Sequence, residues 1–265
     1  MLHIYDHRWL SSQEDEGEEP GDQPNKKHEP SYEAMPRFWV STEEIKGRLR
    51  KQGWQYEWLI GMRKITNATN ERTIIPTIFP MGAVGNSEHI LFPDSNLPLA
   101  KVMFFFGAAC SLTADYVARQ KIGGTNLNFF YLEQLPFLTP EQASDATDAF
   151  ITPKVLELTY TSHNLAPFAR DLGHDGPPFA WVEDRRADLR ADLDAFYARA
   201  YGLTRDELRY ILDPADVKGP DYPSESFRVL KNKEVVKYGE YRTQRLVLAA
   251  WDRMEANGEF TAMGM

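Results

Sequence analysis

An apolar run from Leu97 to Gln120 constrains the fold of this chain more than any other stretch. Its large apolar residues recur every three or four positions, at Leu99, Val102, Met103, Phe106, Ala109, Leu112 and Tyr116. This spacing predicts one long helix with a buried face, against which other elements must pack. The helix is expected to end near Arg119 and Lys121, because basic residues suit the negative end of a helix dipole. Gly123 and Gly124 then predict a turn, since glycine enters the left-handed region at little cost.

The character of the chain changes near residue 140. Before it, strand-type segments alternate with loops, and after it several segments show helical spacing. We therefore expect an α+β chain, with a mixed α/β domain over residues 1–140 and a helical module over residues 141–265. Within the first part, residues 11–34 are rich in Glu, Asp, Gly and Pro, with almost nothing to bury. They predict an acidic, disordered insertion.

Individual elements can be predicted from local signals. Strand composition marks residues 1–10, 54–65, 73–79 and 89–92, and a further extended segment over residues 129–138. Pro76 and Pro80 make the third of these an edge strand or a bulged one. Ser41 is expected to start a short helix, and later helices are expected to begin at Thr139, Thr152 and Thr204. Helical spacing also covers residues 183–201, 224–237 and 241–257.

Charge is distributed unevenly along the 265 residues, whose formal net charge is -9. Residues 1–36 carry three Lys or Arg against nine Asp or Glu, and residues 141–265 carry sixteen against twenty-two. Residues 37–140 carry eleven against eight, so the middle of the chain is its only basic part. A domain that binds DNA unaided is usually far more basic. Any DNA affinity therefore requires another domain to supply much of the phosphate contact.

The sequence predicts a cytoplasmic protein that does not enter a membrane. Its single cysteine, Cys110, cannot form an internal disulfide, which favours a reducing compartment. The longest apolar run, Val102 to Leu112, is too short to cross a bilayer. The first four residues, Met-Leu-His-Ile, lack the charged and apolar regions of a signal peptide.

Catalytic motifs are absent from the sequence. It has no phosphate-binding Gly-x-x-x-x-Gly-Lys-Ser/Thr loop, no Gly-x-Gly-x-x-Gly after a strand and no Gly-x-Ser-x-Gly elbow. His3 and His7 are four residues apart but have no third ligand nearby in the sequence, so we expect no metal site. No residue is assigned a catalytic role, and no cofactor is expected in this chain.

The turn after the long helix is the best candidate binding site. Arg can grip guanine or phosphate, Asn can pair with adenine, and glycine lets a backbone come close to a ligand. The candidate DNA-contacting residues are Arg63, Lys64, Arg72, Arg119, Lys121, Gly123, Gly124, Thr125, Asn126 and Asn128. The alternative interpretation is structural: the glycines form an ordinary turn, the asparagines satisfy loop amides, Arg119 pairs with an acid and Arg72 binds backbone carbonyls. The nearby aromatic residues are predicted to be core, at Phe104, Phe105, Phe106, Phe129, Phe130 and Tyr131.

Several segments, taken in order, resemble one family: the C-terminal region of large bacterial adenine-N6 DNA methyltransferases of restriction-modification and phage-defence systems, including type IIG enzymes. The segments are residues 4–9 (Ile-Tyr-Asp-His-Arg-Trp), 63–73, 118–136, 201–214, 223–230 and 238–243. More loosely, the helix, turn and closing Leu135-Pro136 also resemble the target-recognition domains of type I specificity subunits. The resemblance covers most of the chain except the acidic insertion.

This resemblance implies a role in sequence-specific recognition of double-stranded DNA, with methyl transfer elsewhere. In such enzymes the catalytic half binds S-adenosylmethionine and holds a flipped adenine with an Asn-Pro-Pro-Tyr or Asp-Pro-Pro-Tyr motif. Neither feature occurs in this sequence. The implied partners are therefore DNA and a methyltransferase domain or subunit. The rival hypothesis is an assembly module of a defence complex that reads no DNA, which the acidic helices favour.

Overall fold

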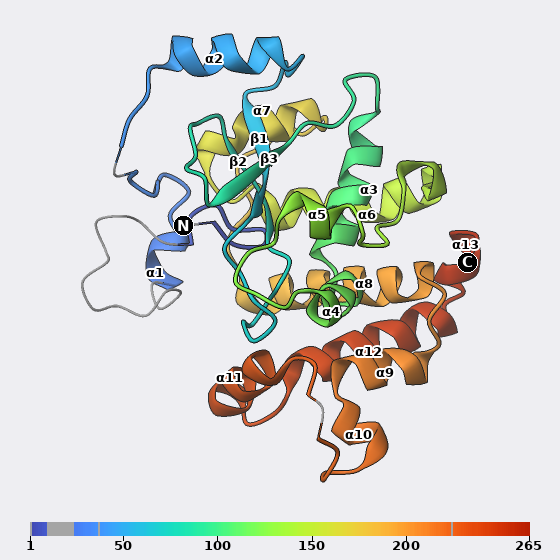
Figure 1. Ribbon diagram of the computed structural model, residues 1–265. Coiled ribbons are helices and arrows are strands. Elements are labelled where there is room, and N and C mark those ends of the chain that lie inside the picture. Colours follow the sequence, from blue (N-terminus) through green and yellow to red (C-terminus); the bar gives the residue numbers. More distant parts are fainter. Residues whose placement is uncertain (1, 10–23, 37, 224) are drawn as a thin grey trace.

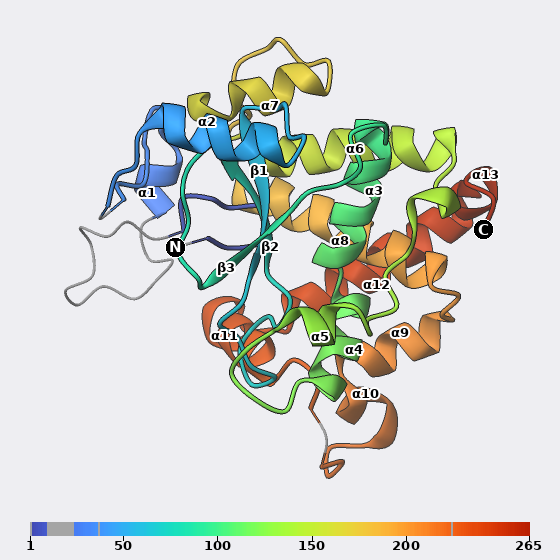
Figure 2. The same ribbon diagram turned by 45° about the horizontal axis from the view of Figure 1, so that its top comes forward.

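The structure, a computed structural model, describes residues 2–9, 24–36, 38–223 and 225–265, and it is an α+β fold, as predicted. A small sheet packs beside α3 and α6, and α8 and then α12 lie beyond them as further helical layers (Figure 1). Figure 2 shows α2 and α7 at one end of the sheet and α4, α5 and α10 toward the other.

The sheet has three antiparallel strands in the order β2-β1-β3. The central strand, β1 (Trp58–Arg63), is buried along nearly its whole length because helices cover it, so its burial does not alternate. The strand β2 (Pro76–Pro80) has a proline at each end and lies at an edge, as the sequence indicates. The third strand is β3 (Glu88–Leu91), and Ile60 of β1 lies opposite Leu91.

The long helix predicted from residues 97–120 is two helices, α3 (Leu99–Cys110) and α4 (Leu112–Lys121), bent by 56°. Ser111 breaks it: the Ser111 backbone is extended, and its hydroxyl donates to the Ala108 carbonyl and accepts from the Ala114 N–H. The side chain of Asp194 accepts from the Leu112 N–H at 2.7 Å. These contacts supply acceptors for the Leu112 and Ala114 amides, which the break deprives of helical partners.

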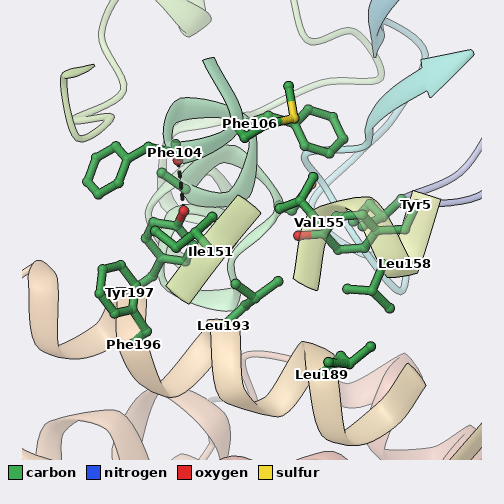
Figure 3. Packing of buried hydrophobic residues seen from close by; sticks show 14 of the residues in the cluster. Tyr5, Phe104, Phe106, Ile151, Val155, Leu158, Leu189, Leu193, Phe196 and Tyr197 are labelled. Atoms are coloured by element: carbon green, nitrogen blue, oxygen red, sulfur yellow. Dashed lines mark hydrogen bonds between the residues drawn. The ribbon is translucent and has the colours of Figure 1, made fainter. Parts of the chain in front are cut away.

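The main core lies between α3, α6 (Asp145–Thr159) and α8 (Glu183–Ala200) (Figure 3). Tyr197 donates its buried hydroxyl to the Phe104 carbonyl at 2.8 Å, and Gly107 leaves the space that this ring fills. One cluster of buried apolar residues runs from Ile4 to Met263. Residue 140 therefore separates two kinds of secondary structure that share one core.

Three of the remaining C-terminal helices follow predicted segments: α9 (Arg205–Leu212), α11 (Arg228–Tyr238) and α12 (Arg242–Ala256). Two short helices were not predicted, α10 (Pro214–Lys218) and α13 (Glu259–Ala262). Thr204 and Glu207 form the capping box that starts α9. The sequence was misleading at Pro153, which does not start a helix but lies inside α6. This proline is exposed, and Ser144 supplies the cap nine residues earlier.

The N-terminal part differs most from the sequence-based expectation. Residues 2–9 form a turn closed by a His3–Asp6 bridge, not a strand. Of the insertion predicted to be disordered, residues 11–23 lie outside the described part of the chain. Residues 24–34 are ordered, because Lys27 is buried and binds Asp6 at 2.6 Å while Arg8 donates to the Glu29 carbonyl. The short helix α1 (Pro24–Lys27) lies here, and α2 (Thr42–Lys51) follows its predicted cap at Ser41.

Two short helices and two 3-10 turns complete the described chain. The segment 129–138, predicted to be extended, begins instead with α5 (Phe129–Leu132). A 3-10 turn over Pro140–Gln142 follows, where a helix start was predicted, and another over His163–Leu165 leads into α7 (Ala166–Asp171).

Candidate functional site

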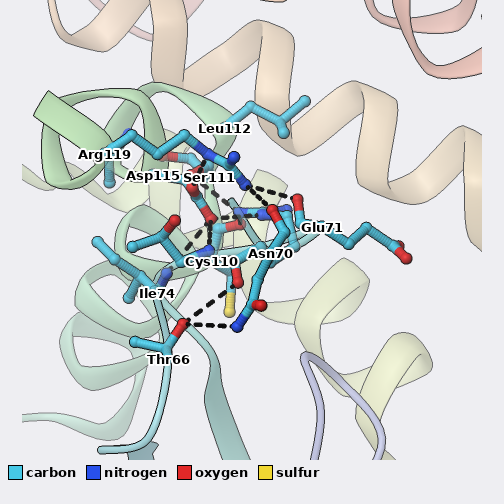
Figure 4. Close-up of polar contacts among 12 residues, drawn as sticks. Thr66, Asn70, Glu71, Ile74, Cys110, Ser111, Leu112, Asp115 and Arg119 are labelled. Atoms are coloured by element: carbon cyan, nitrogen blue, oxygen red, sulfur yellow. Dashed lines mark hydrogen bonds and ion pairs between the residues drawn. The ribbon is translucent and has the colours of Figure 1, made fainter. Parts of the chain in front are cut away.

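A buried carboxylate, Asp115, lies beneath the candidate loop. The cap at Ser111 places it in the first turn of α4, facing the loop that precedes β2. Its two oxygens accept from Nε of Arg72 and Nε of Arg119, each at 2.7 Å, and from the Thr73 N–H at 2.8 Å (Figure 4). Since Asp115 is fully buried, these contacts make it the centre of an internal polar network.

Arg119 is committed to this network. Besides Asp115, its guanidinium donates to the carbonyls of Ala68, Ser226, Asn70 and Glu71 at 2.6–3.1 Å. All five of its N–H groups therefore have acceptors, and its side chain is 5% exposed. Arg119 ties α4 to the 66–71 loop and has no donor left for DNA. Arg119 thus pairs with an acid, as the structural alternative in the sequence analysis expected.

Arg72 also holds the fold. It donates to the carbonyls of Cys110 and Ser111, at the C-terminal end of α3, where a cation offsets the helix dipole. Burial disfavours its charged form, but Asp115 and Asp194, together with Cys110, outweigh that effect and raise the pKa of Arg72. Arg72 therefore binds backbone carbonyls, as the structural alternative in the sequence analysis expected. Its side chain lies inside the molecule.

The turn itself is anchored to the sheet. Backbone hydrogen bonds join the Thr66 N–H to the Thr125 carbonyl at 3.1 Å and the Leu127 N–H to the Lys64 carbonyl at 2.7 Å. Leu127 is fully buried and fixes the segment from below. Residues 125–127 thus extend the sheet beyond β1, and the side chains that flank Leu127 are presented on a supported backbone.

Most of the other predicted residues lie on this exposed turn. Lys121, Gly123, Gly124, Thr125, Asn126 and Asn128 are exposed, whereas Lys64 and Arg63 are half-buried. Burial lowers the pKa of Arg63, and Glu88 opposite it in β3 raises that pKa again. Neither glycine has the left-handed backbone that the sequence suggested, because Ile122, in an extended conformation, ends α4.

Sequence reasoning missed the apolar part of the same surface. Phe129 and Phe130, predicted to be core, are 53% and 65% exposed, and Ile65, which is bridged to Asn126, is 55% exposed. His89 packs its ring 4.2 Å from that of Phe129 and contacts the Leu127 carbonyl through Nε2. Composition gave no signal for this exposure, since a Phe-Phe-Tyr-Leu run reads as core. We call these residues the turn surface: Lys64, Ile65, Lys121, Gly123, Gly124, Thr125, Asn126, Asn128, Phe129 and Phe130.

The described residues contain no group of three or more His, Cys, Asp or Glu side chains placed to hold a metal ion. Within the same residues no single helix is long and apolar enough to cross a membrane. The sequence matches no family model, and comparisons with curated proteins and with solved structures find no similar protein.

Proposed function

We propose that this chain is the DNA-recognition part of a bacterial adenine-N6 DNA methyltransferase system, and that it acts with a catalytic domain located elsewhere. The observation that carries the proposal is the turn surface, where exposed Lys, Thr and Asn side chains stand beside two exposed phenylalanines on an anchored backbone. Such a surface offers donors for phosphates, amides for base edges and rings for stacking.

The roles divide by position. Lys64 and Lys121 would contact phosphates, while Asn126 and Asn128 would read base edges. Arg72 and Arg119 keep the turn in place from beneath it. Base flipping and methyl transfer, with S-adenosylmethionine, would occur on the catalytic domain.

Because only two lysines of the turn surface would contact phosphates, the affinity for DNA should depend only weakly on salt concentration. Each neutralised phosphate contributes about -0.9 to the slope of log affinity against log salt, so this surface alone gives about -2. Such binding is measurable only when a catalytic partner adds its own contacts, which agrees with the net charge of -9.

The test is binding of random duplex DNA at several salt concentrations, by the chain alone and together with a candidate methyltransferase domain. Lys121→Ala is expected to weaken binding by the pair and to reduce the salt slope by about 1. Lys51→Ala, an equal charge change on the exposed side of α2, serves as the control. Unchanged binding by Lys121→Ala, with an unchanged melting temperature, would remove the turn surface from DNA recognition.

The alternative function is an assembly module, and a specific observation favours it. Besides Phe129 and Phe130, the segment before α2 exposes Phe38 by 80% and Trp39 by 74%. Exposed aromatic side chains are typical of protein interfaces. If Phe129→Ala with Phe130→Ala abolishes the complex with a partner protein, and the wild-type complex binds no DNA, the assembly role replaces the DNA role.

A further inference from the structure

A cleft of about 310 Å³ shares no lining residue with the turn surface. It is bounded by the N-terminal turn over residues 3–9, the first half of α8, and the α11–α12 junction. Figure 1 shows α11 beside the end of α8 that lies nearest the N-terminus. Its volume falls in the range of small-molecule sites in proteins.

The carboxylates that line the cleft already have partners. Glu234 accepts from Thr243 with both oxygens, at 2.6 and 2.7 Å. Asp6 binds Lys27, and Glu71 binds Lys233. Asp194 accepts from the Leu112 N–H. Asp6 and Glu71 are thus neutralised by lysines, whereas Glu234 and Asp194 are held by neutral hydrogen-bond donors.

Three cations of the lining have no such partner. Within the described residues, Arg186, Arg190 and Lys237 form no salt bridge. Arg186 is buried, and it donates to the carbonyls of Leu158 and Tyr5, at 2.7 and 3.1 Å. Burial and then the neighbouring Arg190 lower the pKa of Arg186 to about 9, while Asp6 and Glu183 act in the opposite direction.

One further carboxylate faces these cations. Burial alone would raise the pKa of Glu183. The hydrogen bond that its carboxylate accepts from the Trp181 N–H, together with the three cations, lowers that pKa overall. Over the whole lining, seven Lys or Arg side chains face five Asp or Glu side chains, so positive charge is in formal excess by two. Arg190 and Lys237 are exposed, so they can turn toward a ligand.

Aromatic faces line the same space. Tyr238 is 39% exposed, and the Nζ of Lys237 and the guanidinium carbon of Arg242 lie 5.1 and 4.8 Å from its ring centroid. Trp9 also lines the cleft, and its ring stacks on that of His3 with the centroids 4.1 Å apart. A ring next to cations suits a ligand with a flat part and a charged part.

We propose that this cleft binds a small phosphate-bearing ligand with a planar group, the chemistry of a nucleotide. Arg190 and Lys237 contact its phosphates, and its planar group lies against Tyr238. Arg186 supplies fixed positive charge from below. The inference does not depend on DNA recognition by the turn surface.

The test is calorimetric titration of the full chain with ATP and with inorganic triphosphate, without added metal. The double variant Arg190→Ala, Lys237→Ala is expected to bind ATP about a hundredfold more weakly, since each charged hydrogen bond contributes about tenfold or more. Arg48→Ala with Lys51→Ala makes the same charge change on exposed positions of α2 and is expected to bind as the wild type does. Tyr238→Ala should weaken ATP but not triphosphate.

Several outcomes would overturn this proposal. The first is that wild type binds neither ATP nor triphosphate at millimolar concentration. The second is that the cleft variant and the α2 variant bind ATP equally, which would place any site elsewhere. The third is that duplex DNA alone binds, and that the cleft variant loses it, which would make the cleft part of a nucleic-acid surface. Circular dichroism of each variant confirms that the fold is retained.

Discussion

Replacing Asp115 by alanine tests the internal network most directly. The carboxylate is fully buried and faces two guanidiniums whose side chains are only 11% and 5% exposed. Removing one side of a buried ion pair costs about 3–5 kcal/mol, because the remaining charge is left without a partner. The N–H groups of Thr73 and Ile74 also lose their acceptor, at about 1–3 kcal/mol each where no water replaces it. These terms overlap, so we expect a loss of about 5 kcal/mol, similar to the whole stability of a marginal domain.

Urea unfolding followed by circular dichroism measures this loss as a change in the free energy of unfolding. Asp252→Ala is the matched control, because it breaks an exposed Arg205–Asp252 pair and is expected to cost about 1 kcal/mol or less. Asp115→Asn keeps an acceptor for the two amides, so its loss in the free energy of unfolding should lie between the losses of Asp115→Ala and Asp252→Ala. A loss below about 1 kcal/mol for Asp115→Ala would refute the reasoning, since it would show that the two arginines are stable without the carboxylate.

Three further predictions concern stability. Arg119→Ala should destabilise the fold by about 3 kcal/mol or more by thermal and urea unfolding, because four carbonyls and Asp115 lose their donor; an unchanged melting temperature would contradict its buried role. Gly107→Ala should cost about 1–3 kcal/mol in urea, since a Cβ there meets the Tyr197 hydroxyl at 2.5 Å, whereas Gly47→Ala in α2, with open space around it, should be neutral or stabilising. Burial lowers the pKa of His7 from 6.5 to about 4, so the unfolded state binds its proton first, and stability is lost as pH falls from 6.5 toward 4. At pH 5 this amounts to about 2 kcal/mol, and urea titrations at pH 7 and pH 5 should show a smaller difference for His7→Gln than for wild type.

The sequence identified most helices because their signals are local. Ser41 and Thr204 each cap the helix that follows them, and a hydroxyl followed by an acid three residues later is sufficient to mark such a start. The break at Ser111 was missed because it depends on Asp194, a residue more than eighty positions away that accepts the freed amide. The periodic apolar pattern continues through the break, so it contains no sign of the turn. The break between α3 and α4 is therefore set by a tertiary contact and not by the local sequence pattern.

The turn after α4 was expected to be a polar surface segment, but the position of each of its side chains required the structure. Phe129 is exposed because of the path that the chain takes after Leu127 enters the core. The amino-acid composition of the segment does not indicate that path. Exposure of Lys121 and Asn126 did agree with the expected polar surface. Their contact with DNA stays a prediction.

The charge argument from sequence changes once burial is known. Arg8, Arg72, Arg119 and Arg186 each donate to backbone carbonyls from segments distant in the sequence. Two of the eleven cations in the basic middle of the chain, Arg72 and Arg119, are therefore inside and share one carboxylate. The excess of positive charge over residues 37–140 thus overstates the field at the surface, because a buried arginine with satisfied donors contributes to folding and little to steering. Exposed lysines and the unpaired cations of the cleft, not the total count, are the residues on which any anion binding by this chain must depend.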